Sequence, residues 1–214
     1  MTYVGAPLAL LALLAGTSEL SFVTSLGRVT VDLAPVQPDG FSVTPRRVEF
    51  RSDDGRPLLR TSFDVGGPYA FGVWDVRLRG LPNPVIVVVS TWVAADHVVV
   101  EPALVGALAG RFGDLLPRRP TLEINDAACL YPSTADRPAL LTTLDWTGGY
   151  CVACWPKPYV VTRYEFDGLR FRWRWQFTSD VVFDGPVQVV SHFGIPCDLD
   201  LVHDLESHLV EGAR

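Results

Sequence analysis

The sequence predicts a mainly β protein, all-β or β-dominated α+β, built from antiparallel hairpins with one central helix and a short C-terminal helix. Three observations predict this class. Glycine and proline number 18 and 17 and are spread along the 214 residues, which suits many short strands joined by turns. Several segments alternate apolar and polar residues with the two-residue period of a half-buried strand. The hydrophobic fraction of 48% is sufficient for a packed core, and we expect a single β-rich domain over residues 19–214.

Short strands are predicted along the first half of the chain. Residues 27–33 alternate in the period of a strand, and residues 47–51 and 57–63 lie on either side of the turn at Asp54 and Gly55. Residues 85–92 are a β-branched run that is typical of a buried strand. A turn can then lead this strand back into residues 97–100.

Two helices are predicted from apolar stripes. Residues 102–116 begin with a proline at an allowed first position and end before Pro117. Their stripe consists of Leu104, Leu108, Phe112 and Leu115. In residues 196–210, Asp198 can cap a helix whose buried stripe is Val202, Leu205 and Leu209.

The clearest local pattern is a hairpin over residues 159–177. A two-residue turn at Asp167 and Gly168 predicts that Phe166 pairs with Leu169, and it sets the register of the whole hairpin. The next predicted pairs are Glu165 with Arg170 and Tyr164 with Phe171. In this register one face of the second strand is aromatic (Phe171, Trp173, Trp175, Phe177) and the other is polar (Arg170, Arg172, Arg174, Gln176).

The N-terminal segment has no charged side chain over residues 1–18 and is nearly continuously apolar over residues 4–15. Small residues follow the apolar run, as at a signal-peptide cleavage site, so we expect a signal peptide over residues 1–18. A buried helix of a soluble protein is one alternative. An uncleaved membrane anchor over residues 3–26 is the other, because this stretch contains only one charge, Glu19.

An internal repeat is predicted because residues 56–74 align without gaps on residues 137–155. The shared residues are Arg56/Arg137, Pro57/Pro138, Leu59/Leu140, Thr61/Thr142, Asp64/Asp145, Gly67/Gly148, Tyr69/Tyr150 and Trp74/Trp155. The pattern is a short apolar strand, an Asp-led glycine turn and an aromatic-ended strand. It is consistent with two repeated units of about 80 residues, over 20–100 and 101–195.

These segments resemble the FG-GAP or VCBS type of β-repeat in exported bacterial proteins. Residues 145–149 (DWTGG) followed by 164–168 (YEFDG) are similar to the order of strand, Asp- and Gly-rich loop and hairpin in those repeats. The resemblance covers about a third of the chain and implies a β-repeat scaffold with a binding role. Each loop keeps one carboxylate, too few oxygen ligands for tight calcium binding, so neither a metal nor a cofactor is predicted.

The four cysteines, Cys129, Cys151, Cys154 and Cys197, are candidates for disulfides, with three possible connectivities. Two other interpretations stay open. Cys151 and Cys154 could form a redox pair, but a hairpin rather than a helix follows them. The same two residues could supply half of a zinc site, with Cys129 and Cys197 as isolated further ligands.

Catalytic motifs are not recognisable in the sequence. No nucleophile elbow, phosphate-binding glycine loop or His-Glu-x-x-His helix is present. Asp200, Asp204 and His208 are four residues apart, as metal ligands on one helix face can be, but the solvated face of a helix explains them better. Asp96 next to His97 is explained in the same way, as surface residues of a turn. The net charge of −6 argues against nucleic acid as a partner.

Two sets of side chains are candidate binding residues. Arg163, Arg170, Arg172 and Arg174 could pair with an acidic partner, and Trp173 and Trp175, together with Trp146 and Trp155, could stack on sugar rings. A solvent-exposed cationic face and ordinary core packing are the respective structural explanations.

Three functions follow from these observations. The first is an exported, non-enzymatic β-domain, periplasmic, on the outer envelope or secreted, that binds a protein or glycan of the cell envelope. The second is a hydrolase with an unrecognised acid/base site that uses His97 or His192. The third is an accessory subunit of a membrane complex, held at the membrane by residues 3–26.

Overall fold

The computed structural model describes residues 19–32, 44–66, 69–76, 84–94, 97–108, 111–116, 118–123, 125–131, 133, 137–147, 157–204 and 209–211. The predicted signal peptide, Cys151, Cys154 and His208 lie outside these residues.

Three antiparallel sheets follow one another along the chain. The first sheet has four strands in sequential order: β1 (Glu19–Thr24), β2 (Gly27–Asp32), β3 (Thr44–Arg51) and β4 (Pro57–Val65). The central sheet has the order β15-β5-β6-β7-β8, and β9 also pairs with β7. Its strands are β5 (Tyr69–Val76), β6 (Val85–Ala94), β7 (His97–Leu108), β8 (Arg111–Asp114), β9 (Leu122–Glu123) and β15 (Leu209–Glu211).

The third sheet has five strands in the order β13-β12-β11-β10-β14. They are β10 (Ala127–Tyr131), β11 (Leu140–Trp146), β12 (Tyr159–Phe166), β13 (Phe171–Thr178) and β14 (Leu199–Asp200). Helix α1 (Pro186–Phe193) follows β13 in the sequence. This architecture confirms the predicted β-dominated fold class.

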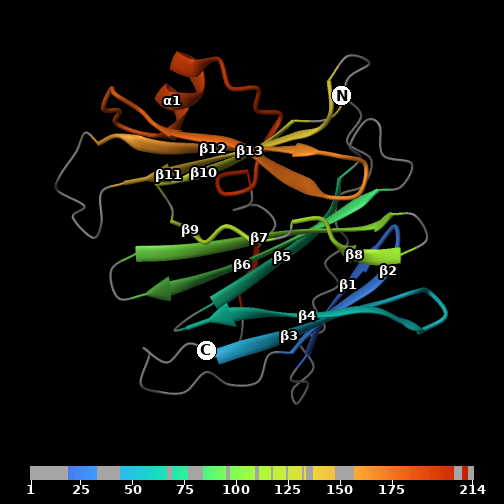
Figure 1. The fold of residues 1–214 in the computed structure, drawn as a ribbon. Helices are drawn as coiled ribbons and strands as arrows, with labels where there is room; N and C mark the ends of the chain where they lie inside the picture. The colour runs from blue at the N-terminus through green and yellow to red at the C-terminus, as the bar shows by residue number, and fades with distance from the viewer. Residues whose placement is uncertain are drawn as a thin grey trace.

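The sheets are stacked as layers, with the central sheet between the other two and α1 on the far side of the third sheet (Figure 1). Adjacent residues of β6 point to opposite faces of the central sheet. Ile86 and Val88 pack toward the first sheet, whereas Val85, Val87 and Val89 pack toward the third. The central sheet is therefore buried on both faces. This position explains why residues 85–89 are continuously apolar instead of alternating.

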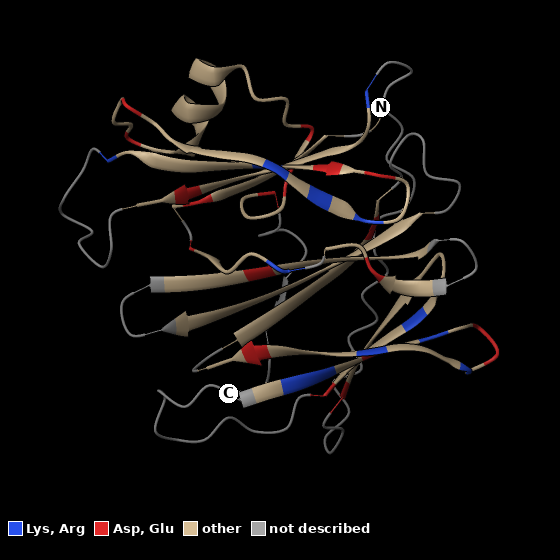
Figure 2. Cartoon of the chain, viewed as in Figure 1, with Lys and Arg blue, Asp and Glu red and all other residues tan. Residues whose placement is uncertain are grey.

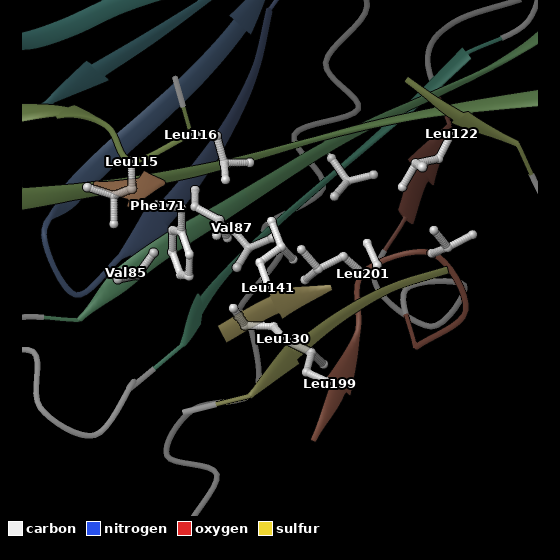
Figure 3. Close-up of a cluster of buried hydrophobic side chains, with 14 of the residues drawn as sticks. Val85, Val87, Leu115, Leu116, Leu122, Leu130, Leu141, Phe171, Leu199 and Leu201 are labelled. Carbon is white, nitrogen blue, oxygen red and sulfur yellow. The ribbon is translucent and has the colours of Figure 1, made fainter. Parts of the chain in front are cut away.

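The core between the central and third sheets is mainly aliphatic and also contains the buried aromatic residues Trp74 and Phe171, of which Figure 3 labels Phe171. Val85, Val87 and Leu115 enter this core from the central-sheet side, and Leu141 and Phe171 enter it from the third sheet. The backbone N–H of Phe171 also donates to the Leu115 carbonyl at 2.8 Å. The beginning of β13 is thereby attached to the central layer.

Arg119 links the first sheet to the central one. Its guanidinium donates to the Ser62 carbonyl at 2.8 Å and to the Thr61 hydroxyl, both on β4. It also forms ion pairs with Asp114 at 2.8 Å and Glu101 at 3.2 Å, on strands of the central sheet. Because the side chain is mostly buried, this network fixes how the two layers meet.

The predicted helix over residues 102–116 is wrong, because this segment forms β7 and β8. Val98–Val100 continue the β-branched character of the strand, and β7 pairs with the whole of β6, from His97 opposite Ala94 to Gly106 opposite Val85. Pro102 is tolerated because it lies between the part of β7 that pairs with β9 and the part that pairs with β8. No strand on that side needs its missing N–H.

The predicted C-terminal helix over residues 196–210 is also wrong. Asp198 caps no helix there, and its backbone N–H donates to the Leu130 carbonyl at 3.2 Å. Residues 199–200 form β14 beside β10, and β15 pairs with β5 of the central sheet. Pairing with existing sheets outweighs the weak helical periodicity of this segment.

Helix α1 was not predicted, although two signals for it are present. Pro186 occupies its first turn, and Gly194 ends it with a φ of 59°, in the left-handed conformation. The Gln188 carboxamide also accepts from the Asp184 N–H at 3.1 Å. Proline at the start and glycine just past the end are a typical helix signature.

The predicted hairpin exists, but its turn is longer than expected. Phe166 pairs with Phe171, so residues 167–170 form the connection, and Asp167 accepts hydrogen bonds from the backbone N–H groups of Leu169 and Arg170. The register also shifts between Arg163 and Tyr164, because Arg163 pairs with Trp175 whereas Tyr164 pairs with Trp173. Arg174 is thus the extra residue of a β-bulge.

The other predicted strands are confirmed, since residues 27–32, 47–51, 57–63, 85–92 and 97–100 lie in β2, β3, β4, β6 and the start of β7. Residue 33, the last of the predicted strand 27–33, lies outside the described residues.

The predicted repeat and the predicted anchor are described only in part. The first strands of both repeat copies are present as β4 and β11, but the second strand of the second copy, residues 150–155, lies outside the described residues. The end of the predicted anchor, Glu19–Thr24, is strand β1 of the first sheet, so a spanning helix over the whole of residues 3–26 is wrong.

Candidate functional site

The outer face of the third sheet, which points away from the central sheet, is only partly covered by α1. The covered part packs Leu144, Tyr159 and Val161 against the helix residue Val189. Helix α1 does not cover the part of this face near β13, where large aromatic side chains are exposed to solvent. This uncovered part is the candidate binding surface.

One row of side chains crosses the four longer strands of this sheet on the outer face. The register places Cys129 opposite Thr142, Thr142 opposite Arg163, and Arg163 opposite Trp175. Side chains that are directly opposite on neighbouring strands are close enough to contact each other. Accordingly, the Arg163 guanidinium lies over the Trp175 ring, 5.1 Å from its centroid.

Aromatic rings extend from Trp175 to the helix. The Trp175 and Phe177 ring centroids are 5.6 Å apart, and those of Phe177 and Phe193 are 5.1 Å apart. Phe193 in turn contacts Phe183, which is buried. Trp175 and Phe177 are 36% and 37% exposed, so their rings are held from below and open to solvent above.

Charged side chains surround these rings. Arg174 forms an ion pair with Glu165 at 2.7 Å, and Arg172 forms one with Asp167 at 2.6 Å. The hydrogen bond from Arg172 and the backbone amides of Arg170 and Leu169 hold the pKa of Asp167 well below its usual range. Figure 2 shows the basic positions of β13 along the edge of the third sheet.

We define the β13 patch by its exposed rings and their charged neighbours: Arg163, Glu165, Arg174, Trp175, Phe177 and Phe193. The predicted division of this hairpin into an aromatic face and a cationic face is wrong, because of the bulge. Phe171 faces the inner core, but the extra residue Arg174 turns Trp175 and Phe177 outward. Arginine and aromatic side chains therefore share one face.

The structure brings only some of the predicted binding residues together. Arg163, Arg174 and Trp175 belong to the patch, and Arg172 lies at its edge beside Asp167. Arg170 is in the exposed hairpin connection. Trp173 is 59% exposed but pairs with Tyr164, which packs against the inner core, so Trp173 is on the other side of the strand.

Other residues of this surface were missed by sequence reasoning. Phe193 comes from the unpredicted helix α1, which its proline and glycine signals could have revealed. Glu165 reaches Arg174 only because of the bulge, for which the sequence gives no recognisable signal. Thr142 was seen only as a repeat position, and its place beside Arg163 depends on the pairing of β11 with β12.

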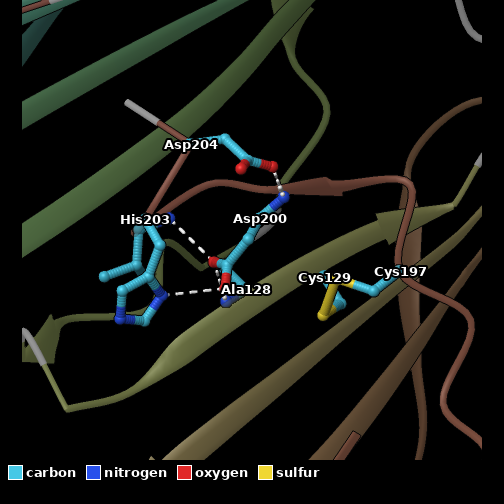
Figure 4. Close-up of a disulfide and its surroundings, with 7 residues drawn as sticks. Ala128, Cys129, Cys197, Asp200, His203 and Asp204 are labelled. Carbon is cyan, nitrogen blue, oxygen red and sulfur yellow. Dashed lines mark hydrogen bonds and ion pairs between the residues drawn. A yellow bond between two sulfur atoms is a disulfide. The ribbon is translucent and has the colours of Figure 1, made fainter. Parts of the chain in front are cut away.

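Cys129 and Cys197 form a disulfide, which confirms two of the four cysteine candidates (Figure 4). The bond joins β10 to the segment before β14 and lies against the outer core of the third sheet. Since both sulfurs are bonded to each other, these two residues cannot complete a zinc site with Cys151 and Cys154. The latter pair lies outside the described residues.

The histidines with described side chains have structural surroundings. His203 contacts Asp200 at 2.9 Å, and Asp200 also accepts from the N–H groups of Ala128 and Val202 (Figure 4). Burial raises the pKa of Asp200, but the hydrogen bonds from His203 and the backbone outweigh burial and keep the pKa below its usual value. His192 packs against the rings of Phe183 and Phe193.

Metal binding finds no support in the described ranges. There, no group of three or more His, Cys, Asp or Glu side chains is placed to hold a metal ion. Asp200 and Asp204 lie in a turn in which Asp204 accepts from the Asp200 N–H at 2.7 Å. The predicted helical spacing of Asp200 and Asp204 is therefore wrong, while His97 has no described side chain.

Asp126 is a buried carboxyl group between β9 and β10. It is 3% exposed, and its two oxygens accept from the backbone N–H groups of Glu123 at 2.6 Å and Trp146 at 2.7 Å. Burial raises the pKa of Asp126 to about 7, and the charges of Asp145 and Glu123 add to this rise. Because both oxygens accept hydrogen bonds from backbone amides, Asp126 links β11 to the turn that precedes β10.

This pKa predicts that the protein loses stability as pH rises. The folded state holds the proton up to about pH 7, whereas the unfolded chain releases it near the ordinary aspartate pKa of 3.8. The stabilisation that protonated Asp126 contributes is therefore complete below pH 4 and is lost as pH rises through 7. Between pH 5 and 8 we expect the unfolding free energy to fall by about 3 kcal/mol through this group.

Urea denaturation at a series of pH values measures this dependence. Asp126→Asn should have a flatter profile between pH 5 and 8, and it should be less stable at pH 5 because its amide nitrogen faces a backbone N–H. Asp53→Asn, on an exposed turn, is the matched control. An unchanged slope in Asp126→Asn would show that another group carries the pH dependence.

In the described part of the chain, no helix is both long enough and apolar enough to cross a membrane. Comparison of the whole chain with protein-family models, curated proteins and solved structures gave no match.

Proposed function

We propose that this protein is an exported, non-enzymatic binding domain that holds a saccharide of the cell envelope on the β13 patch. The observation that carries this proposal is the row of exposed aromatic rings on a rigid sheet. Large aromatic side chains are normally buried, and an exposed group of them marks a binding surface. Here they lie beside charged groups that can hydrogen-bond to hydroxyls.

The geometry of the patch suits a sugar ring. Trp175 and Phe177 offer apolar faces to the C–H groups of a pyranose, and Glu165 and Arg174 lie within reach of its hydroxyls. Few rotatable bonds are left to order on binding, since Phe193 supports Phe177 and Arg163 lies over Trp175. A rigid aromatic platform with polar groups at its margin is typical of small-molecule sites.

Addition of a partner strand to the edge of β13 is the less favoured mode. The strand carries a bulge and two arginines, Arg172 and Arg174. Bulges and charged side chains are the devices by which edge strands avoid pairing with another chain. Recognition through side chains on the outer face is therefore favoured over recognition through the strand backbone.

Export is supported by the disulfide and by the apolar N-terminal run. Disulfides persist in oxidising compartments and are rare in the cytosol. The Cys129–Cys197 bond lies in the same sheet as the β13 patch. A saccharide of the envelope is thus a ligand that the protein would meet in the compartment its disulfide favours.

A panel of soluble oligosaccharides, screened on an array and then measured by calorimetry, tests this proposal. We expect Trp175→Ala to weaken binding of the tightest-binding saccharide at least tenfold, equal to about 1.4 kcal/mol. Trp173→Ala is the matched control because it removes an exposed tryptophan outside the patch, and it should bind normally. The proposal would be overturned if the protein bound no saccharide. It would also be overturned if the Trp175→Ala and Trp173→Ala variants captured a protein partner equally well.

A further inference from the structure

Arg163 differs from the other arginines of this surface in having no acceptor. Arg172 and Arg174 are each neutralised by a carboxylate at 2.6 and 2.7 Å. The Arg163 Nε is buried and has no hydrogen-bond partner, and no ion pair joins its guanidinium to another described residue. A buried donor without an acceptor costs free energy, so such a group calls for an explanation.

A second unpartnered polar group lies beside it. Thr142 is directly opposite Arg163 on β11, is fully buried, and its hydroxyl has no hydrogen-bond partner. Trp175 lies on the other side of Arg163 and holds the guanidinium in place through a cation–π contact. A fixed cation with an unpartnered Nε is thus flanked by a hydroxyl and by a partly exposed ring.

The local charge balance defines the ligand. Glu165 and Asp167 are each paired with an arginine, so the positive charge of Arg163 remains uncompensated in the patch. One guanidinium matches one carboxylate, which it can bind with two parallel hydrogen bonds. A neutral sugar would leave this charge unpaired.

We propose that the β13 patch selects saccharides that carry a carboxylate, such as chains of hexuronic acids. Arg163 receives the carboxylate while the sugar ring lies against Trp175. This inference rests on the proposed function and adds the chemical class of the ligand.

The test compares a uronic-acid oligosaccharide with its carboxyl-reduced counterpart, which has the same linkages without the charge. For the native protein we expect at least tenfold tighter binding of the acidic form, and we expect added NaCl to reduce this preference. Arg163→Met should bind both forms with the weaker affinity. Arg170→Met, in the exposed hairpin connection, is the matched control and should keep the preference.

The outcomes separate the two proposals. Equal affinity of the native protein for both forms would overturn the role of Arg163 and leave saccharide binding standing. Failure to bind either form or any other saccharide would overturn both proposals. The native protein with the two ligands decides the question by itself, even where Arg163→Met does not fold. The indole N–H signal of Trp175 in NMR spectra should also shift on addition of the acidic form.

Discussion

Replacement of Val87 and Val88 together by alanine is expected to lower the unfolding free energy by about 5 kcal/mol. Both side chains are fully buried, but they point to opposite faces of the central sheet. Val87 packs into the core toward the third sheet, and Val88 packs into the core toward the first. Each truncation removes two methyl groups and leaves a cavity in a different layer, for about 2–3 kcal/mol each.

Single variants provide the internal control, measured by urea denaturation. Val87→Ala and Val88→Ala should be similarly destabilising, because each side chain is fully buried in a different core. In a sheet with one solvated face, one of two adjacent residues would be exposed and its truncation nearly neutral. A neutral effect at either position would therefore contradict the three-layer arrangement.

Removal of the disulfide is expected to cost about 4 kcal/mol, because Cys129 and Cys197 are 68 residues apart and their bond restricts a long loop of the unfolded chain. The Cys129→Ala/Cys197→Ala variant measures this cost without a reductant. Addition of a reductant should bring the native protein toward the stability of this variant. A loss below about 1 kcal/mol would show that strand pairing alone anchors the segment before β14.

The β character of the protein could be predicted from local patterns, whereas its layering could not. Strands β2, β3, β4 and β6 were recognisable because alternation and β-branched runs are local properties. Residues 102–116 were not, because an apolar stripe of helical period also fits a strand buried on both faces. Only the partner strands on either side decide between the two, and a single sequence does not contain that information.

The candidate site shows the same limit at finer scale. The residues of the hairpin were predicted as binding candidates, but their distribution over two faces depends on one inserted residue at Arg174. A bulge is set by how two strands fit together, and side-chain alternation cannot reveal it. Thr142 lies beside Arg163 only because β11 pairs with β12, and no local pattern identifies it, whereas Phe193 belongs to a helix that its proline and glycine signals indicate.

The order of the sheets along the chain has a consequence for how the protein folds. Each layer is nearly a continuous stretch of sequence, so most strand pairings close short loops and incur little loop-closure entropy. Contact order is thus low for an all-β chain, which favours fast folding and lets the layers form as separate cooperative units. The pairings of β14 with β10 and of β15 with β5 are the exceptions, since Leu199 lies opposite Leu130 and Leu209 lies opposite Gly72. The pairing of β15 with β5 spans the longer stretch of chain. This distant contact couples the end of the described chain to its central layer, and it is the step that loop entropy delays most.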